Sequence, residues 1–142
     1  MTGSLYLGTS GFAYPEWKGI FYPPATKAEQ MLPFYASRFR SVEINYTFRR
    51  HPAETTLAAW LERTPPGFRF TLKAHQRITH TRRLRDAEEA LGMFCERARL
   101  LGDRLGPILF QLPPSLEHAP DVLEGFLPVS YTHLTLPTIC SV

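Results

Sequence analysis

Alternating apolar and polar positions recur along this chain in short runs that are bounded by proline and glycine. A two-residue period is typical of a strand whose two faces lie in different surroundings. The runs that predict strands are residues 5–12 (LYLGTSGF), 41–48 (SVEINYTF), 68–74 (FRFTLKA) and 107–113 (PILFQLP).

Helical periodicity separates these runs, because apolar side chains recur there every three or four residues. Thr26 and Glu29 have the spacing of a capping box, which predicts a helix over residues 26–38. Pro52 is expected in the first turn of a second helix, and Asp86 is expected to open a third. Strand and helix therefore alternate along the chain.

This alternation predicts right-handed crossovers and a parallel sheet, which both a doubly wound sheet and a β/α barrel satisfy. The second, third and fourth strands favour the barrel because each has one polar face. A doubly wound sheet is covered by helices on both faces and would be apolar on both. The predicted fold is α/β, a partial TIM-type β/α barrel of about four βα units of eight, with parallel strands and outer helices.

Polar side chains at the ends of these strands are the strongest candidates for a site. Glu43, Asn45, Lys73 and Gln111 lie on polar faces and are expected to point at the barrel axis, near the mouth where barrel sites lie. Glu43 and Lys73 are the predicted catalytic residues, as a general acid/base and an electrophile. The alternative is a buried ion pair and amide network that fills the polar layer of the barrel.

Several short motifs along the chain also resemble those of a known family. They are GTSGF near the start, W-x-G-x-F-Y-P over 17–23, VEIN with the following TF, F-x-F-x-x-K over 68–73, ITH over 78–80 and LFQLPP over 109–114. In this order they resemble the YecE-like family, also called domain of unknown function 72. The resemblance runs from about residue 5 to about residue 128 and implies a β/α barrel with a polar mouth, but no particular reaction.

The loop after the third strand is basic and is expected to open on the same mouth. Its cationic side chains and imidazoles are His75, Arg77, His80, Arg82, Arg83 and Arg85. The planar fork of arginine suits phosphate, so a phosphorylated or nucleic-acid ligand is predicted. The alternative is a solvated charged loop. The predicted ligand-binding residues are Ser10, Trp17, Tyr22, Asn45, Arg49, His80 and Gln111.

The sequence leaves open whether the protein is an enzyme or a binding module that uses the same mouth without chemistry. His51, His75, His80 and Glu43 lack close metal-ligand spacing, so neither a metal nor a cofactor is expected. The net charge of +3 permits an anionic partner without requiring one.

The remaining totals fit one globular domain, with 142 residues of which 44% are hydrophobic. No apolar run reaches the roughly 18 residues of a membrane span. The first residues lack the pattern of a signal peptide, so a cytoplasmic location is expected.

The last residues, VSYTHLTLPTICSV over 129–142, contain no Lys, Arg, Asp or Glu. The reverse complement of a transposase sequencing adapter, translated in one frame, gives the sequence of residues 129–138. We therefore interpret residues 1–128 as the N-terminal half of the barrel and residues 129–142 as a non-native tail of translated sequencing adapter. The tail is expected to lie outside the sheet, as coil or as a poorly packed strand.

Overall fold

Three parallel strands form one sheet in the computed structural model, which describes residues 3–134. In sheet order the strands are β1 (Ser41–Ile44), β2 (Arg69–Lys73) and β3 (Leu105–Leu109). Glu43 lies beside Thr71, and Lys73 lies beside Leu109. The α/β class and the parallel sheet are confirmed.

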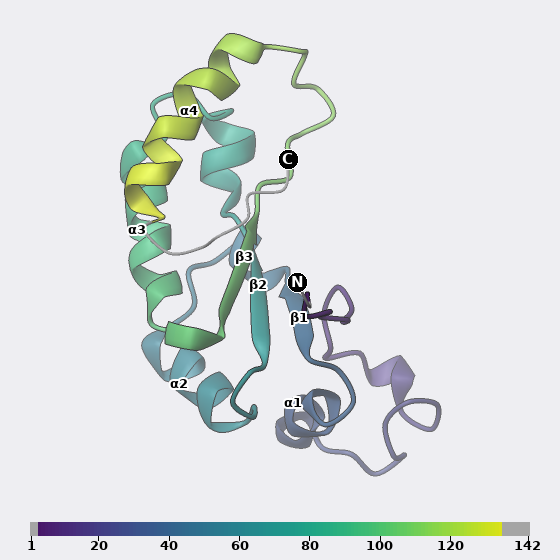
Figure 1. Cartoon of the computed structure of the whole chain (residues 1–142). Helices are drawn as coiled ribbons and strands as arrows, with labels where there is room; N and C mark the ends of the chain where they lie inside the picture. Colours follow the sequence, from purple (N-terminus) through teal and green to yellow (C-terminus); the bar gives the residue numbers. More distant parts are fainter. Residues whose placement is uncertain (1–2, 135–142) are drawn as a thin grey trace.

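Helices α2, α3 and α4 lie along one side of this sheet, and α1 lies at the end where the strands begin (Figure 1). The helices are α1 (Ala28–Ala36), α2 (Glu54–Glu62), α3 (Glu88–Arg99) and α4 (Pro120–His133). The short helical turns are η1 (Pro15–Trp17), η2 (Tyr46–Phe48), η3 (Arg77–Thr81) and η4 (Gly102–Arg104). Within residues 3–134, no helix has the length and apolar character needed to cross a membrane.

The segment predicted as the first strand, residues 5–12, follows β1 without forming a full strand. One parallel bridge joins Ser10 to Glu43. The two backbones come very close at Gly8, where an added Cβ would lie 1.9 Å from the carbonyl oxygen of Ser41. Glycine is therefore required at this position, and the segment places Ser10 at the end of β1.

The helix starts differ from those predicted. α1 begins after Lys27, whose backbone N–H donates to Gln30 Oε1 at 2.9 Å, so Thr26 and Glu29 do not form the capping box. α3 begins later than predicted because Asp86 has a φ of 46°. That left-handed conformation cannot belong to a right-handed helix.

The third strand in the sheet also begins and ends earlier than predicted, at 105–109 rather than 107–113. Its register against β2 is irregular beside Gly106 and Pro107. Proline donates no ladder hydrogen bond and is found on edge strands, and β3 is an edge strand of this sheet.

The two faces of the sheet differ as the alternation predicted. The apolar face packs against helices and is nearly inaccessible to water; its members are Val42, Ile44, Phe70, Leu72 and Ile108. The opposite face carries half-buried residues, namely Ser41, Glu43, Arg69, Thr71, Lys73 and Leu109. Glu43 and Lys73 therefore share the face that these helices leave uncovered.

Residues 129–133 continue helix α4, so the expectation of coil or strand is wrong for them. Val122, Phe126 and Ser130 are buried at a four-residue spacing, which places them along one side of the helix. Burial of that side explains why the helix extends past the proposed boundary at residue 128. The rest of the predicted tail, residues 135–142, lies outside the described residues.

Candidate functional site

Three polar side chains meet where β1 ends. Ser10 Oγ donates a hydrogen bond to Glu43 Oε1 at 3.0 Å, and Asn45 Nδ2 donates to Ser10 Oγ at 2.6 Å. The serine hydroxyl thus accepts from the amide and donates to the carboxylate, which fixes the orientation of both. Among the described residues, no group donates to Glu43 Oε2 or to Asn45 Oδ1. We call these three residues the polar cluster.

Backbone contacts on either side of Ser10 hold it in place. Gly11 N–H donates to the carbonyl oxygen of Glu43 at 2.8 Å. Thr9 N–H donates to the hydroxyl of Tyr35 at 2.7 Å, and that hydroxyl in turn lies 3.0 Å from the carbonyl oxygen of Ser41. The position of Ser10 is therefore set by buried Tyr35 and by the edge of β1.

Lys73, at the end of β2, lies on the same face as the polar cluster but forms no ion pair with Glu43. Its Nζ lies 4.9 Å from the ring centroid of Phe48, a distance typical of a cation–π contact. No carboxylate within residues 3–134 comes close enough to Lys73 for a salt bridge. The positive charge of Lys73 is therefore not neutralised by the protein.

Thr47 and Phe48 complete this site and were not predicted. Thr47 is fully buried, and its Oγ1 lies 2.7 Å from the carbonyl oxygen of Lys73 and 3.0 Å from that of Ile44. One hydroxyl thus connects the ends of two neighbouring strands. The alternation in 41–48 continues through both residues, which is why the sequence indicated a strand where the structure has the turn η2.

His80 reaches the same region from η3. Its ring lies 4.9 Å from that of Phe48 at an interplanar angle of 80°, and its Nδ1 lies 2.9 Å from Thr79 Oγ1. The arginines further along the loop are exposed, and Arg83 Nη2 donates to Ser115 Oγ at 3.0 Å. The structure therefore groups Lys73, Phe48 and His80, which we call the cationic cluster.

The other predicted ligand-binding residues do not join either cluster. Tyr22 is buried, its hydroxyl donates to the carbonyl oxygen of Phe12, and burial raises the pKa of Tyr22 to about 12. Trp17 packs against Tyr14 and Tyr22. Both predicted residues belong to an aromatic core that supports the N-terminal segment.

Arg49 and Gln111 are exposed at the ends of η2 and β3. Only the backbone of Arg49 makes a polar contact, since its carbonyl oxygen lies 3.3 Å from His75 Nε2. Neither side chain makes a hydrogen bond within the part of the chain that the structure describes. Both side chains are accessible to a ligand, but no hydrogen bond fixes their orientation.

His51 and His75 stack with their ring centroids 4.7 Å apart and their planes 5° from parallel. His75 Nδ1 accepts a hydrogen bond from the backbone N–H of Arg77 at 3.1 Å. His51 Nδ1 is buried without a hydrogen-bond partner. Across residues 3–134, no three His, Cys, Asp or Glu side chains are grouped as metal ligands would be.

The pKa of His51 lies below its ordinary value because of burial, and then because of His75, Arg97 and Arg77. The unfolded chain therefore takes up a proton at a higher pH than the folded chain. We expect the free energy of unfolding to be highest above the ordinary histidine pKa of about 6.5 and to fall as the pH drops through that value. The loss ends once the pH is below the folded pKa of His51.

Urea unfolding at a series of pH values, in wild type and in His51→Gln, measures this effect. The variant should lose less stability than wild type between neutral and mildly acidic pH. His118→Gln, at an exposed position, is the matched control and should keep the wild-type dependence. Identical pH dependence in all three proteins would show that His51 does not contribute.

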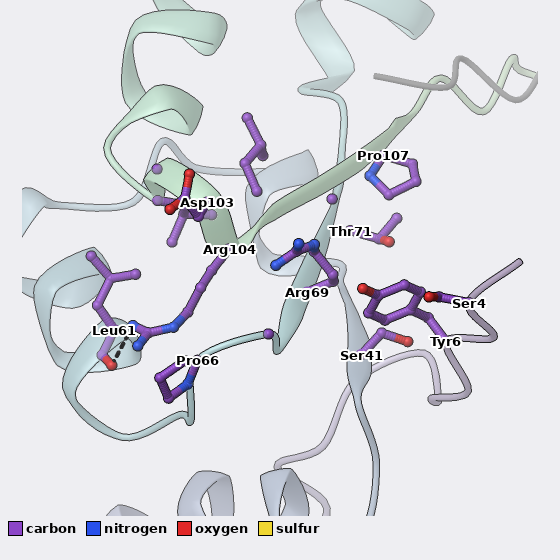
Figure 2. Close-up of a pocket in the computed structure, with 15 residues that line it drawn as sticks. Ser4, Tyr6, Ser41, Leu61, Pro66, Arg69, Thr71, Asp103, Arg104 and Pro107 are labelled. Atoms are coloured by element: carbon purple, nitrogen blue, oxygen red, sulfur yellow. Dashed lines mark hydrogen bonds between the residues drawn. The ribbon is translucent and has the colours of Figure 1, made fainter. Parts of the chain in front are cut away.

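A cavity of about 1110 Å³ lies at the opposite end of the same face, where the strands begin. Figure 2 shows Tyr6, Ser41, Arg69 and Thr71 on one side of it and Arg104 on the other. Arg69 lies over the ring of Tyr6, 5.6 Å from its centroid, and Arg104 Nη1 donates to the carbonyl oxygen of Leu61 at 2.6 Å. Arg69 Nη1 also donates to the carbonyl oxygen of Phe68 at 3.3 Å, so both arginines donate hydrogen bonds to backbone carbonyls, whereas among the described residues Lys73 Nζ has only its contact with the ring of Phe48.

The sequence profile described as "Protein of unknown function DUF72" matches residues 6–136. The UPF0759 protein YecE of Escherichia coli (strain K12) is 30% identical over 129 residues, which cover 85% of this chain and 45% of YecE. The UPF0759 protein YunF of Bacillus subtilis (strain 168) is 29% identical, with 78% of this chain and 40% of YunF covered. The chain thus spans less than half the length of these relatives.

Two solved structures are similar to this chain. A DUF72 family protein from Thermotoga maritima MSB8 is 32% identical with a TM-score of 0.77, over 95% of this chain and 53% of that protein. A DUF72 family protein from Enterococcus faecalis V583 is 21% identical with a TM-score of 0.74, over 95% of this chain and 49% of that protein. The second likeness concerns the fold alone.

Proposed function

Because this chain belongs to the DUF72 family of proteins of unknown function, we propose that its polar strand ends form part of a binding site for a phosphate-bearing ligand. In this proposal residues 1–128 are the N-terminal half of a TIM-type barrel, and the site lies at its C-terminal mouth. Two facts support the barrel: the strands are parallel, and the chain covers 53% of a solved relative.

The observation that carries the proposal is the un-neutralised charge of Lys73 on the face that also holds the polar cluster. An ammonium group that contacts an aromatic ring rather than a carboxylate is available to an anion. The C-terminal ends of parallel strands are where sites lie in barrel enzymes. The exposed arginines of the loop after β2 add positive charge nearby and would attract a phosphate from solution.

In an enzyme, Glu43 would serve as the general acid/base. One oxygen of its carboxylate accepts a hydrogen bond from Ser10, and the second accepts none from the described residues, which suits proton transfer to a bound ligand. Lys73 would stabilise negative charge on that ligand, as an electrophile. The second candidate function is a binding module for a small molecule or a nucleic acid. It uses the same contacts and requires no proton transfer.

Binding of labelled single-stranded and duplex DNA and of a small phosphate ester, at low and moderate salt, tests the proposal. We expect at least one of these ligands to bind this chain and full-length YecE, and to bind more weakly as salt rises, because released counterions drive such binding. Lys73→Met should weaken binding by about tenfold or more. Lys18→Met, at an exposed position, is the matched control and should have little effect.

Two results would reject the proposal. One is the absence of binding to every phosphate ligand at low salt. The other is equal affinity in wild type and Lys73→Met. The nucleic-acid form of the proposal also requires that Arg82→Ala with Arg83→Ala weakens DNA binding.

A further inference from the structure

Lys73 and the polar cluster offer opposite chemistry to a ligand. Lys73 presents a cation whose nearest partner is the ring of Phe48. Glu43 and Asn45 present oxygens, Oε2 and Oδ1, that accept nothing from the described residues, while the Ser10 hydroxyl is engaged on both sides. One end of the site therefore suits an anion, and the other suits a group that donates hydrogen bonds.

The sheet register places these two ends close together. Glu43 pairs with Thr71, and Lys73 lies two residues beyond Thr71 on the same face of β2. The Cα atoms of Glu43 and Lys73 are therefore diagonal neighbours, roughly 8 Å apart, and Asn45 is tied to Glu43 through Ser10. A ligand that contacts both ends therefore needs its anionic group and its hydrogen-bond donor within about 10 Å of each other.

The carboxylate of Glu43 also restricts which ligands fit. A phosphate placed against Glu43 would be repelled, because like charges at contact distance are unfavourable. A hydroxyl placed there would donate to the carboxylate in a charge-assisted hydrogen bond. The anion is thus directed to Lys73 and a hydroxyl to Glu43. A ligand that presents only phosphate groups to the site would bind less well.

We infer that the ligand is a small hydroxylated phosphate ester of the sugar-phosphate class, an inference that rests on the proposed function. Its phosphate lies against Lys73, with His80 close by, and a hydroxyl donates to Glu43 Oε2 or to Asn45 Oδ1. Phe48 acts as a positioning residue that holds Lys73 and His80. The ligand must therefore carry both a phosphate and a hydroxyl group.

The aromatic rings of the site favour this class over a nucleic acid, which binds by stacking bases on open rings. Lys73 and His80 already contact Phe48, and Trp17 is packed against other rings. Tyr46 is 48% exposed, so stacking on Tyr46 is the competing interpretation and can be tested separately.

Calorimetric titration of this chain with glucose 6-phosphate, glucose, inorganic phosphate and a short oligothymidylate tests the inference. We expect glucose 6-phosphate to bind about tenfold or more tightly than inorganic phosphate or glucose, because it alone satisfies both ends. Glu43→Gln with Asn45→Ala should remove that advantage without weakening inorganic phosphate. Glu16→Gln, on exposed η1, is the matched control.

Substitution of Phe48 tests whether its ring positions the ammonium group of Lys73. Phe48→Leu should weaken both phosphate ligands and shift the NMR resonances of the Lys73 side chain, whereas Phe48→Tyr should restore binding. If inorganic phosphate and glucose 6-phosphate bind equally, or the double variant keeps the advantage, the inference is wrong and the proposed function stands. The inference is also wrong, and the proposed function stands, if the oligothymidylate binds more tightly than glucose 6-phosphate and Tyr46→Ala removes that binding. If nothing binds, both are rejected.

Discussion

Replacing Phe70 by Ala should lower the free energy of unfolding by about 3–5 kcal/mol. Phe70 is completely buried in β2, the central strand. Its ring stacks on Trp60 at 5.5 Å and meets the edge of Phe68 at 5.0 Å. Truncating a buried phenylalanine costs about 3–5 kcal/mol, and a whole domain is stable by only about 5–15 kcal/mol. Because helices α2, α3 and α4 cover only one face of this sheet, we expect a free energy of unfolding near the lower end of that range.

Far-ultraviolet circular dichroism during urea unfolding provides the measurement. Phe70→Leu should lose less stability than Phe70→Ala because it leaves a smaller cavity. Met93→Ala, on the 46% exposed Met93 of α3, should change the midpoint little. A Phe70→Ala protein that loses less than about 1 kcal/mol would contradict the core described above.

Purified residues 1–142 should be catalytically inactive and should form oligomers or aggregates rather than a monomer. β3 pairs with β2 on one side only, and the face that carries Glu43 and Lys73 is not covered by α2, α3 or α4 (Figure 1). Unpaired strand edges recruit other chains. Apolar side chains near the N-terminus also project into solvent: Leu5 is 80%, Leu7 63% and Ile20 88% exposed.

Light scattering coupled to size-exclusion chromatography measures the mass directly, and Leu109→Lys tests the cause. Leu109 lies in the edge strand β3, where a charge opposes pairing with another chain. The variant should shift the population towards the monomer, whereas Leu100→Lys, on the 47% exposed Leu100, should not. A wild-type monomer with one sharp cooperative unfolding transition would contradict this prediction and show that residues 1–142 fold independently.

The sheet was largely predictable because alternation records which face is buried. Val42 and Ile44 identify the helix-covered face of β1, and Glu43 identifies the opposite one. The ends of elements were less predictable. The left-handed φ of Asp86 and the irregular register beside Pro107 depend on neighbouring segments rather than on local pattern. Helix α4 was not predicted.

Part of the candidate site was predictable for the same reason. Glu43, Asn45 and Lys73 are polar residues at positions that the alternation assigns to one face. Their partners were harder to find: Phe48 continues the strand pattern and yet lies in a turn. Tyr22 was assigned to a ligand from its motif, although its surroundings in three dimensions make it part of the core.

We propose, as before, that residues 129–142 are translated sequencing adapter. The family profile extends to residue 136 and thus overlaps part of this segment. Helix α4 also extends into it, to residue 133. Sequencing the gene by a method that does not use this adapter would decide the origin of these residues.

Chemical-shift mapping on isotope-labelled chain locates the site most directly. With a phosphate ester as titrant, we predict that the resonances of Ser10, Asn45, Lys73 and His80 move together and saturate. The resonances of Arg69 and Gly106, which line the cavity at the other end of the strands, should stay in place. Shifts confined to Arg69 and Gly106, or no saturable shift anywhere, would contradict a phosphate site at the strand ends.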